Sequence, residues 1–344
     1  MPDEPPFMIL LEDIVRRMRL QTLAAVIVIL ASWLLAATGN AIMEKEAALC
    51  GIVETSERLR RHLMELTVKI GERSVYFPEN LLNAAEYIET SYRAMGLEVE
   101  RQEYSYADMT AVNIVSSIDF SEKPTRTYVL GAHYDSVDGT VGADDNASAI
   151  AVQIETARRL VQLREKGKMN LRVVFVSFAL EEPPVFSTAF MGSRIFARRL
   201  RETKTDIEGM ICLEMVGYTC DIPGCQGYPL PFFFRNYPDT GNFIGIVGNF
   251  KSRGFTSSLM KAFARNPQLS AVSLTVPFNG WILPAVRLSD HASFWDLGFK
   301  AVMVTDTAFF RNPHYHLASD TMETLDYHFM ASLVDSLVIF FEGI

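Results

Sequence analysis

The chain has 344 residues, of which 49% are hydrophobic and 21% charged, and its formal net charge is −9. This balance is typical of a globular protein with one large domain or two small ones, and it argues against intrinsic disorder. The acidic charge argues against a nucleic-acid partner, because such binding depends on clustered Lys and Arg side chains.

A stretch without charged residues runs from Gln21 to Met43, directly after Arg16, Arg17 and Arg19. As a helix this stretch would be roughly 34 Å long, which is enough to cross a bilayer core. Positive charge on its amino side predicts a cytoplasmic N-terminus, with the rest of the chain in the periplasm or outside the cell. The stretch predicts an uncleaved transmembrane anchor. The alternatives are a signal peptide cut within "ATGNA", which would make the remainder secreted, and a buried core helix.

Beyond residue 43 the predicted elements alternate between helix and strand. Helical periodicity is found over 44–66, 78–95, 145–163, 192–202 and 322–343, and short runs typical of strands over 111–118, 127–133, 171–180, 210–216, 242–248, 271–276 and 301–306. Several of these runs are apolar almost throughout, as in strands that are buried on both faces of a sheet. The alternation predicts an α/β fold with three αβα layers around a central mixed, largely parallel sheet.

Two features of the cysteines and loops bear on compartment and function. The four cysteines are too few and too scattered for a disulfide scaffold, but Cys220 and Cys225 can close one small loop in an oxidising compartment. A reduced pair remains the alternative. The segment 220–242, rich in Gly, Pro and aromatic residues, predicts a long loop, and loops of that length in a compact fold are usually functional.

The motif "GAHYDS" places His133 and Asp135 at the carboxyl end of a predicted strand. Side chains two residues apart in a strand point the same way, and open α/β sheets hold ligands at this end. By itself the pattern is weak, because a satisfied polar pair at a strand end would explain it equally well.

Other acids and histidines occupy equivalent positions, at the ends of predicted strands or in the loops that follow. They belong to the stretches "GADDNASA", "FALEEPP", "MICLEMVGY" and "NPHYHLASDT". Adjacent carboxylates repel, and an unpaired carboxylate in a buried strand is costly, so these groups need a cation. Oxygen and imidazole donors without thiolates favour zinc, manganese or cobalt.

Two metals explain the pattern better than one. The predicted protein ligands of two metal ions per chain are His133, Asp145, Glu182, Glu214 and His316. If Asp145 bridges the ions, with His133 and Glu214 on one and the remaining pair on the other, each ion has three protein ligands. Glu181 is then free to act as the general base, and Asp135 orients the ring of His133.

The order of these motifs resembles that of a known family. "HYD", "GADDNAS", "EE" followed by "MGS", "LEM", "SDHASF" and "YHLASDT" occur as in the co-catalytic zinc aminopeptidases of clan MH, of the aminopeptidase Y and aminopeptidase S type. The resemblance spans residues 75–344 and implies the zinc-exopeptidase fold and two zinc ions per chain. It also implies the same five ligands, Glu181 as the base and a cis peptide bond between Asp145 and Asn146. Glu214 departs from the family, because many relatives carry aspartate there, and the connection over 183–191 is longer than is typical, which leaves the preferred substrate side chain open.

The resemblance implies a metallo-aminopeptidase that hydrolyses the N-terminal peptide bond of peptides with a free N-terminus. Residues 1–43 would then be a cytoplasmic N-terminus with an anchor or signal peptide, and residues 44–344 the zinc peptidase domain. His291 and His314 are expected to have supporting roles, because the ligand set is already full. The alternatives are a single-zinc enzyme similar to glutaminyl cyclases, which share this fold, and a non-catalytic, receptor-like ectodomain. The presence of all five ligands and the base argues against the second alternative.

Overall fold

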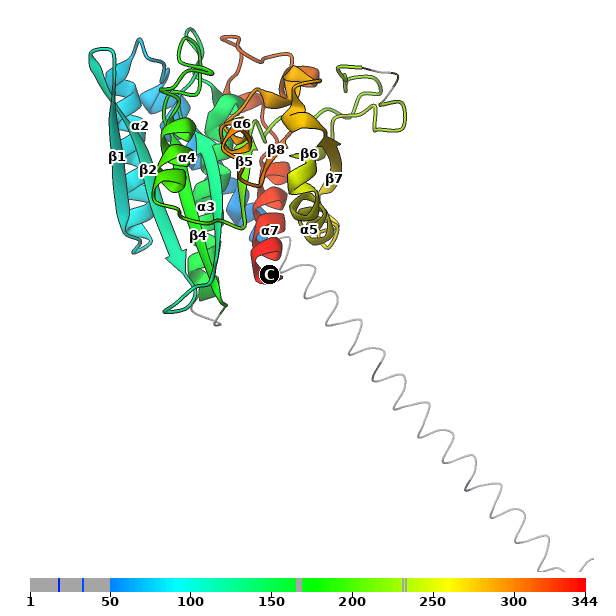
Figure 1. Ribbon diagram of the computed structural model, residues 1–344. Helices are drawn as coiled ribbons and strands as arrows, with labels where there is room; N and C mark the ends of the chain where they lie inside the picture. Colours follow the sequence, from blue (N-terminus) through cyan, green and yellow to red (C-terminus); the bar gives the residue numbers. More distant parts are fainter. Residues whose placement is uncertain (1–17, 19–32, 34–49, 165–168, 231, 233) are drawn as a thin grey trace, which may run out of the picture. The chain divides into compact units, whose positions relative to one another are not determined.

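The computed structural model describes residues 18, 33, 50–164, 169–230, 232 and 234–344. Residues Glu54–Ile344 form one compact unit (Figure 1). In this unit, helical turns over 54–63 continue into η1 (Met64–Ile70), which ends at Gly71.

Eight strands of the described residues form a single sheet. Their bounds are β1 (Val99–Tyr106), β2 (Met109–Asp119), β3 (Arg126–His133), β4 (Leu171–Phe178), β5 (Gly209–Glu214), β6 (Phe243–Asn249), β7 (Ser270–Val276) and β8 (Ala301–Thr305). The strand order is β1-β2-β4-β3-β5-β8-β6-β7. The central strands β4, β3, β5 and β8 are parallel, whereas β2 pairs antiparallel with β4 and with β1, and β6 pairs antiparallel with β8. The predicted mixed sheet with a parallel centre is confirmed.

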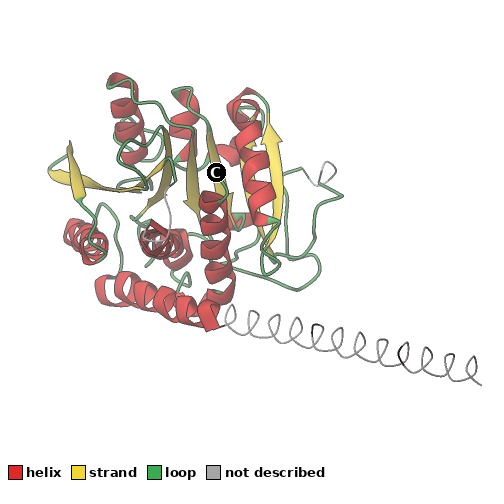
Figure 2. Cartoon of the chain, turned by 90° about the horizontal axis from the view of Figure 1, so that it is seen from below, coloured by secondary structure: helices red, strands yellow, loops and turns green. Residues whose placement is uncertain are grey.

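Helices lie on both sides of the strands (Figure 2). Their bounds are α2 (Pro78–Ala94), α3 (Ala149–Arg164), α4 (Gly192–Glu202), α5 (Arg253–Phe263), α6 (His291–Asp296) and α7 (Tyr327–Glu342). Helix α3 packs against α2 and α7, α7 also packs against α5, and α4 packs against α6. The predicted three-layer α/β fold is therefore confirmed.

Strand β4 shows how one apolar run serves both layers. Its Phe175 ring lies 5.8 Å from the ring of Tyr92 on α2, and its Phe178 ring lies 6.1 Å from that of Phe196 on α4. Residues three apart in a strand point to opposite faces, so α2 and α4 cover opposite faces of the sheet. Both phenylalanines are fully buried, which explains why this strand reads as apolar almost throughout.

Three elements were absent from the sequence prediction: β1, α5 and α6. Strand β1 is an edge strand that pairs with β2, and its residues alternate between partly buried and exposed. Such a strand carries many polar side chains, so an apolar run does not reveal it. Helix α6 has six residues and is buried, which makes it too short for helical periodicity to be recognised.

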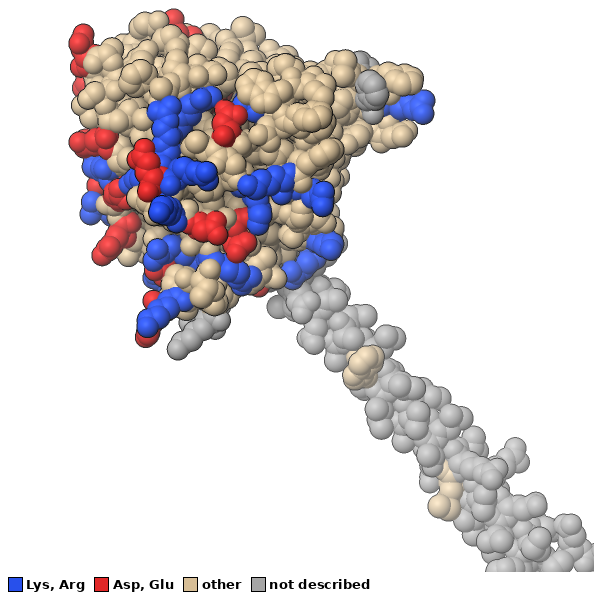
Figure 3. Space-filling view, in the orientation of Figure 1, with Lys and Arg blue, Asp and Glu red and all other residues tan. Residues whose placement is uncertain are grey.

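Charged side chains of both signs are interspersed on the face shown in Figure 3. On α4, Arg194 lies 3.4 Å from Asp296 at the end of α6, and Arg199 pairs with Glu100 of β1. These ion pairs connect α4 to its neighbours on both sides, although exposed pairs of this kind contribute little to stability.

The prediction of a transmembrane helix over 21–43 is corrected. In the described part of the chain, no helix is both long and apolar enough to cross a bilayer. The stretch itself lies outside the described residues, apart from Trp33. Length and hydropathy identify an apolar run, but they do not establish that it forms a membrane helix, and we withdraw the prediction of membrane association. The domain boundary at residue 43 also lies outside the described residues and stays a prediction.

Candidate metal centre

The carboxyl ends of three neighbouring parallel strands bring four of the predicted site residues together. His133 is the last residue of β3, Glu214 is the last residue of β5, and Glu181 and Glu182 follow the end of β4. Strand β3 pairs with both β4 and β5 in parallel, so their carboxyl ends meet at the same edge of the sheet. All four side chains are buried.

Asp145 lies between two histidines that are far apart in the sequence. It belongs to η2 (Ala143–Ser148), which joins the loop after β3 to α3, and its peptide bond to Asn146 is cis, as the resemblance implied. One carboxylate oxygen, Oδ1, is 3.4 Å from Nε2 of His133, and the other, Oδ2, is 3.2 Å from Nε2 of His316. His316 is in the loop between β8 and α7. The two oxygens of Asp145 therefore face two different histidines.

A second carboxylate accompanies each histidine. Oε2 of Glu214 is 3.4 Å from Nε2 of His133, and Oε2 of Glu182 is 3.5 Å from Nε2 of His316. Donor atoms of His133, Asp145 and Glu182 also lie within 4.8 Å of one another, so the two groups adjoin. The structure thus brings all five predicted ligands into one cluster, in which His316 is partly exposed and the other four are buried.

The donor atoms fit a tetrahedral cation. Ligand atoms about 2.0–2.1 Å from a tetrahedral zinc ion are about 3.3 Å apart, and the four histidine–carboxylate separations range from 3.2 to 3.5 Å. The Oε1 atom of Glu182 is buried and has no hydrogen-bond partner among the described residues. Imidazole nitrogens and carboxylate oxygens without a thiolate are donors that suit zinc.

The electrostatics of the cluster also call for a cation. Burial raises the pKa of Glu182 well above its usual value, and the neighbouring charges of Asp145 and Glu181 raise it further. Burial would lower the pKa of His133, but the carboxylates of Glu214 and Glu181 outweigh it and raise that pKa well above 6.5. A divalent cation among these groups would reduce the repulsion that raises the pKa of Glu182.

Asp135 contacts both the ring of His133 and the backbone of the glutamate pair. Its Oδ1 is 3.3 Å from Nδ1 of His133 and accepts a hydrogen bond of 3.0 Å from the amide of Glu181, while Oδ2 accepts one of 2.9 Å from the amide of Glu182. The contact with the ring matches the predicted orienting role. The two amide hydrogen bonds add a second role, which is to fix the segment that carries both glutamates.

Asp320 fixes the backbone of Asp144 and Asp145 in the way that Asp135 fixes the backbone of the two glutamates. The sequence analysis missed this residue. Its Oδ1 accepts a hydrogen bond of 2.8 Å from the amide of Asp144, and its Oδ2 one of 3.1 Å from the amide of Asp145. Asp320 is fully buried and follows His316 by four residues. Its proximity in the sequence to His316, a predicted ligand, is the signal that would have identified it.

The two histidines with predicted supporting roles lie outside the cluster. His291 is buried, donates a hydrogen bond of 2.8 Å from Nε2 to the carbonyl of Val286, and packs edge-on against Trp295. Nδ1 of His314 is 2.9 Å from the hydroxyl of Ser319. Both contacts fit the supporting roles predicted for these residues.

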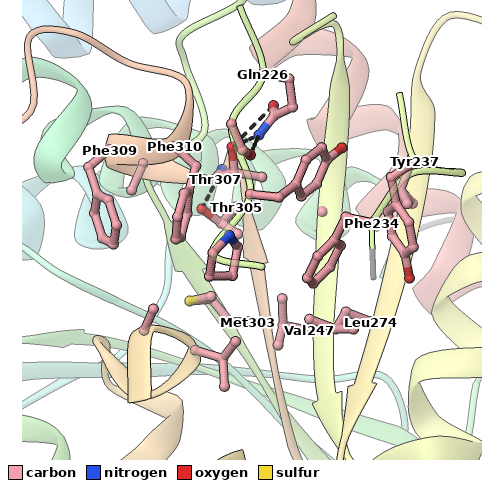
Figure 4. A pocket seen from close by; sticks show the side chains of 18 of the residues that line it. Gln226, Phe234, Tyr237, Val247, Leu274, Met303, Thr305, Thr307, Phe309 and Phe310 are labelled. Atoms are coloured by element: carbon pink, nitrogen blue, oxygen red, sulfur yellow. Dashed lines mark hydrogen bonds between the residues drawn. The ribbon is translucent and has the colours of Figure 1, made fainter. Parts of the chain in front are cut away.

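An apolar pocket adjoins the metal centre, and Glu214 and Tyr315 line it. The Tyr315 ring stacks on that of His316, with 3.7 Å between the ring centres. Apolar side chains from β6, β7, β8 and the loops beside them line the remainder, among them Phe234, Val247, Leu274, Met303, Phe309 and Phe310 (Figure 4). The predicted functional loop over 220–242 contributes one wall through Phe234 and Tyr237.

Three polar residues that line this pocket, Gln226, Thr305 and Thr307, are hydrogen-bonded to one another. Nε2 of Gln226 donates a hydrogen bond of 2.9 Å to Oγ1 of Thr307, and the amide of Thr307 donates one of 2.9 Å to Oγ1 of Thr305 (Figure 4). Nε of Arg311 donates a hydrogen bond of 2.9 Å to Oε1 of Gln226. With these groups satisfied, the pocket suits an apolar side chain.

Comparison with known proteins agrees with this geometry. The model of peptidase family M28 matches residues 113–339. This chain belongs to peptidase family M28. The membership confirms the predicted clan MH peptidase and the prediction of a zinc-dependent hydrolase.

This M28 peptidase is similar to curated proteins from bacteria and fungi. It is 37% identical over 290 residues to the uncharacterized protein YfbL of Escherichia coli (strain K12), covering 82% of this chain and 86% of that protein. It is 24% identical over 253 residues to leucine aminopeptidase 1 of Ajellomyces dermatitidis, covering 70% of this chain and 57% of that protein. The chain thus spans most of the bacterial relative and a little over half of the fungal one.

Solved structures share the fold at low sequence identity. The LapA aminopeptidase of Legionella pneumophila has a TM-score of 0.64 at 20% identity and covers 86% of this chain and 74% of its own. The glutaminyl cyclase of Porphyromonas gingivalis has a TM-score of 0.61 at 16% identity and covers 85% of this chain and 98% of its own. At these identities the likeness shows the fold and does not distinguish the two activities.

Proposed function

We propose that this M28 peptidase is a dinuclear zinc aminopeptidase that hydrolyses the N-terminal peptide bond of peptides with a free N-terminus. The observation that carries the proposal is the position of Asp145, whose two oxygens face two different histidines. A carboxylate in that position suits a bridge between two ions. His133 and Glu214 would hold one ion, and Glu182 and His316 the other.

Glu181 is the residue that moves the proton. It lies beside the ligands, with its Oε2 3.9 Å from Nε2 of His133, and its backbone amide is fixed by Asp135. When bound, the zinc ions act as Lewis acids on the scissile carbonyl and make a water molecule more acidic. Glu181 accepts a proton from that water and delivers it to the leaving amine, which is general acid–base catalysis by one carboxylate.

The apolar pocket receives the side chain of the N-terminal residue. Glu214 and Tyr315 belong both to the surroundings of the cluster and to the lining of the pocket, so a substrate whose carbonyl is at the cluster can place its side chain in the pocket. The satisfied hydrogen bonds of Gln226 and Thr307 leave little for a polar side chain to bind. We therefore expect large apolar residues to be preferred at the N-terminus.

A panel of substrates tests this function. The purified, zinc-loaded chain is assayed on leucyl, phenylalanyl, alanyl, lysyl and glutamyl p-nitroanilides and on N-acetyl-leucyl p-nitroanilide. We expect the leucyl and phenylalanyl compounds to be cleaved fastest, the acetylated compound to be resistant, and plasma emission to find two zinc ions per chain. Cleavage of the acetylated compound as fast as its free form would refute an aminopeptidase, and one zinc ion per chain would refute the dinuclear centre.

A glutaminyl cyclase is the second candidate, supported by the fold shared with the enzyme of Porphyromonas gingivalis. Such an enzyme releases ammonia from an N-terminal glutamine and closes a ring without hydrolysing a peptide bond. Incubation with glutaminyl peptides separates the candidates, because a cyclase releases ammonia whereas an aminopeptidase releases the free amino acid. A chain that binds zinc and does neither would support the receptor-like alternative.

We also propose that the peptidase domain works outside the cytoplasm. The support is the disulfide between Cys220 and Cys225, at the start of the loop that lines the pocket, because structural disulfides persist in oxidising compartments. Alkylation of cells without reductant, followed by mass spectrometry, tests this. Protected cysteines at both positions are expected, and quantitative alkylation of both would refute the proposal.

A further inference from the structure

Arg73 is a fully buried arginine near the metal centre, in the segment between η1 and α2. A buried arginine is usually paired with a carboxylate, because an unpaired buried charge is costly. Here the five side-chain hydrogen bonds of the guanidinium all go to main-chain carbonyl oxygens. The side chain therefore connects backbone segments.

Three of these hydrogen bonds connect the two segments that carry His133 and Asp145. Nε donates to the carbonyl of Tyr134 at 2.7 Å, which is the residue after His133. Nη1 donates to the carbonyl of Val141 at 2.7 Å and Nη2 to that of Gly142 at 2.9 Å, just before the aspartate pair. One planar group thus bonds to both segments.

The remaining contacts connect these segments to the preceding helix. Nη1 also donates to the carbonyls of Leu66 at 3.0 Å and Gly71 at 2.9 Å, in η1 and at its end. The backbone amide of Arg73 donates to Oγ of Ser136 at 3.0 Å, and that hydroxyl donates to the carbonyl of Thr140 at 3.0 Å. The loop from β3 to η2 is therefore bonded at several points to Arg73.

Gly142 permits this close approach. Its φ is +53°, and a Cβ added there would lie 2.2 Å from the carbonyl oxygen of Asp145 and 3.2 Å from Nη2 of Arg73. A larger residue would collide with the segment that carries Asp145 and would crowd the guanidinium. Gly142 in "VGADD" therefore provides both a left-handed backbone conformation and space for the Arg73 side chain.

The charge of Arg73 also acts on the metal centre. Burial lowers the pKa of Arg73 to about 10, while the carboxylates of Asp135, Asp320, Asp145 and Glu182 oppose that shift. The side chain consequently stays charged at neutral pH. Its positive charge reduces the repulsion among these buried acids.

We propose that Arg73 is a positioning residue of the metal centre, which sets the spacing between His133 and Asp145 by bonding to the backbone next to each. The proposal rests on the proposed function, because it takes these two residues as metal ligands. A planar fork with five N–H groups serves this purpose, and a lysine ammonium, with three donors on one atom, cannot reach all the same carbonyls. Replacement of Arg73 by lysine therefore keeps the positive charge and removes most of the hydrogen bonds to the backbone carbonyls.

Metal binding by the purified full chain tests the proposal. Zinc affinity is measured by competition with a chromophoric chelator for the wild type and for Arg73→Lys, and Co²⁺ is added to both metal-free proteins to record the visible absorption spectrum. We expect Arg73→Lys to bind zinc about 10–100-fold more weakly, the scale seen when a residue that supports a metal ligand is replaced. We also expect an altered cobalt spectrum, which a loss of fold stability alone would not cause.

The control variant is Arg287→Lys. Arg287 is also buried and donates to the carbonyl of Asn279 at 2.7 Å and to Asp296 at 2.7 Å, neither of which belongs to the metal cluster. We expect its zinc affinity and cobalt spectrum to match the wild type. Wild-type affinity and an unchanged spectrum for Arg73→Lys would overturn the proposal, even if its thermal midpoint fell.

A second variant serves if Arg73→Lys does not fold. Ser136→Ala removes the hydroxyl that accepts from the Arg73 amide and leaves the buried charge in place. We expect a several-fold loss of zinc affinity in a folded protein, and an unchanged affinity would overturn the proposal. These results are ratios to the wild type, so they are distinguishable from a failure of the proposed function, which would appear in the wild type itself as missing zinc or missing peptidase activity.

Discussion

The metal centre and the apolar pocket share Glu214, but they are built in different ways. The centre consists of buried acids and histidines at the ends of parallel strands, and its stability depends on charge balance. The pocket is lined mainly by apolar side chains from β6, β7, β8 and a long loop, and in the proposed function its shape selects the substrate side chain. If the proposed function holds, this comparison predicts that substitutions in the centre change the chemistry, whereas substitutions in the pocket change the substrate preference.

The largest effect is expected at the metal centre from Glu181→Gln. The amide cannot accept a proton from water, so we expect activity on leucyl p-nitroanilide to fall by about 10²–10⁴-fold. Zinc content should stay near that of the wild type, because Glu181 is not one of the proposed ligands. Loss of zinc together with activity would mean that Glu181 is itself a ligand.

The second-largest effect is expected from Asp320→Asn, which tests whether the hydrogen bonds that Asp320 accepts from the backbone support the metal centre. An amide side chain has one acceptor oxygen, so it cannot accept hydrogen bonds from both Asp144 and Asp145 in the way that the carboxylate does. We expect zinc affinity to fall about 10–100-fold, measured by chelator competition.

Asp326→Asn is the matched control for this variant. Asp326 caps α7 and accepts a hydrogen bond of 2.9 Å from the amide of Phe329. Asparagine is about as good a cap as aspartate, so zinc affinity should not change. Equal zinc affinities for Asp320→Asn and the control would show that the amide hydrogen bonds do not support the centre.

A smaller and more selective effect is expected from Val247→Phe in the pocket. Val247 is on β6 and lines the cavity (Figure 4), so the larger ring occupies space that a substrate side chain would use. We expect kcat/KM for leucyl and phenylalanyl p-nitroanilide to fall about 10–200-fold, with a much smaller change for the alanyl compound.

Val68→Phe, the same substitution at an exposed position of η1, is the control and should leave all three rates unchanged. An equal fall for all three substrates in Val247→Phe would mean that the pocket does not select the side chain. That result would contradict the view that the pocket determines substrate preference separately from the metal centre.

The smallest effect is expected on the pH dependence of fold stability, and it arises from His291 beside the pocket. Burial lowers the pKa of His291 from 6.5 to about 4, the charge of Arg287 lowers it too, and the hydrogen bond to Val286 opposes both. In the unfolded chain this histidine gains a proton below about pH 6.5, whereas in the folded protein it does so near pH 4. The contribution of neutral His291 to the free energy of unfolding is therefore complete above pH 6.5 and is lost as the pH falls to 4. It is at most about 3 kcal/mol.

Denaturant unfolding of the metal-free chain at pH 7 and pH 4.5 measures this effect. The metal-free chain is used so that metal binding does not contribute to the measured change. His291 bonds to the carbonyl of Val286, which lines the pocket, so the measurement concerns the pocket side of the comparison. We expect the free energy of unfolding to fall more steeply with acidity in the wild type than in His291→Gln, whose neutral amide does not titrate. Parallel pH profiles of the two proteins would contradict a neutral buried His291.

The clustering of these acids and histidines could be predicted because they occur in short motifs. Each motif couples a strand end to an acid or a histidine, and such groups are costly in a core unless a cation or a partner balances them. Asp320 and Arg73 escaped prediction because their partners are backbone groups, which leave no residue pattern. The amide of Asp145 lies 175 positions from Asp320, and the carbonyl of Gly142 lies 69 positions from Arg73.

By itself, the sequence determined the α/β class, the buried parallel strands and the types of residue that a metal would need. These are local properties, because strand periodicity and the cost of burying a charge depend on neighbouring residues along the chain. The tertiary structure alone decided the strand order, which sets β3 between β4 and β5 and so brings His133, Glu182 and Glu214 together. It also decided the pocket, whose walls come from segments between residues 214 and 315 and whose shape depends on how those segments pack.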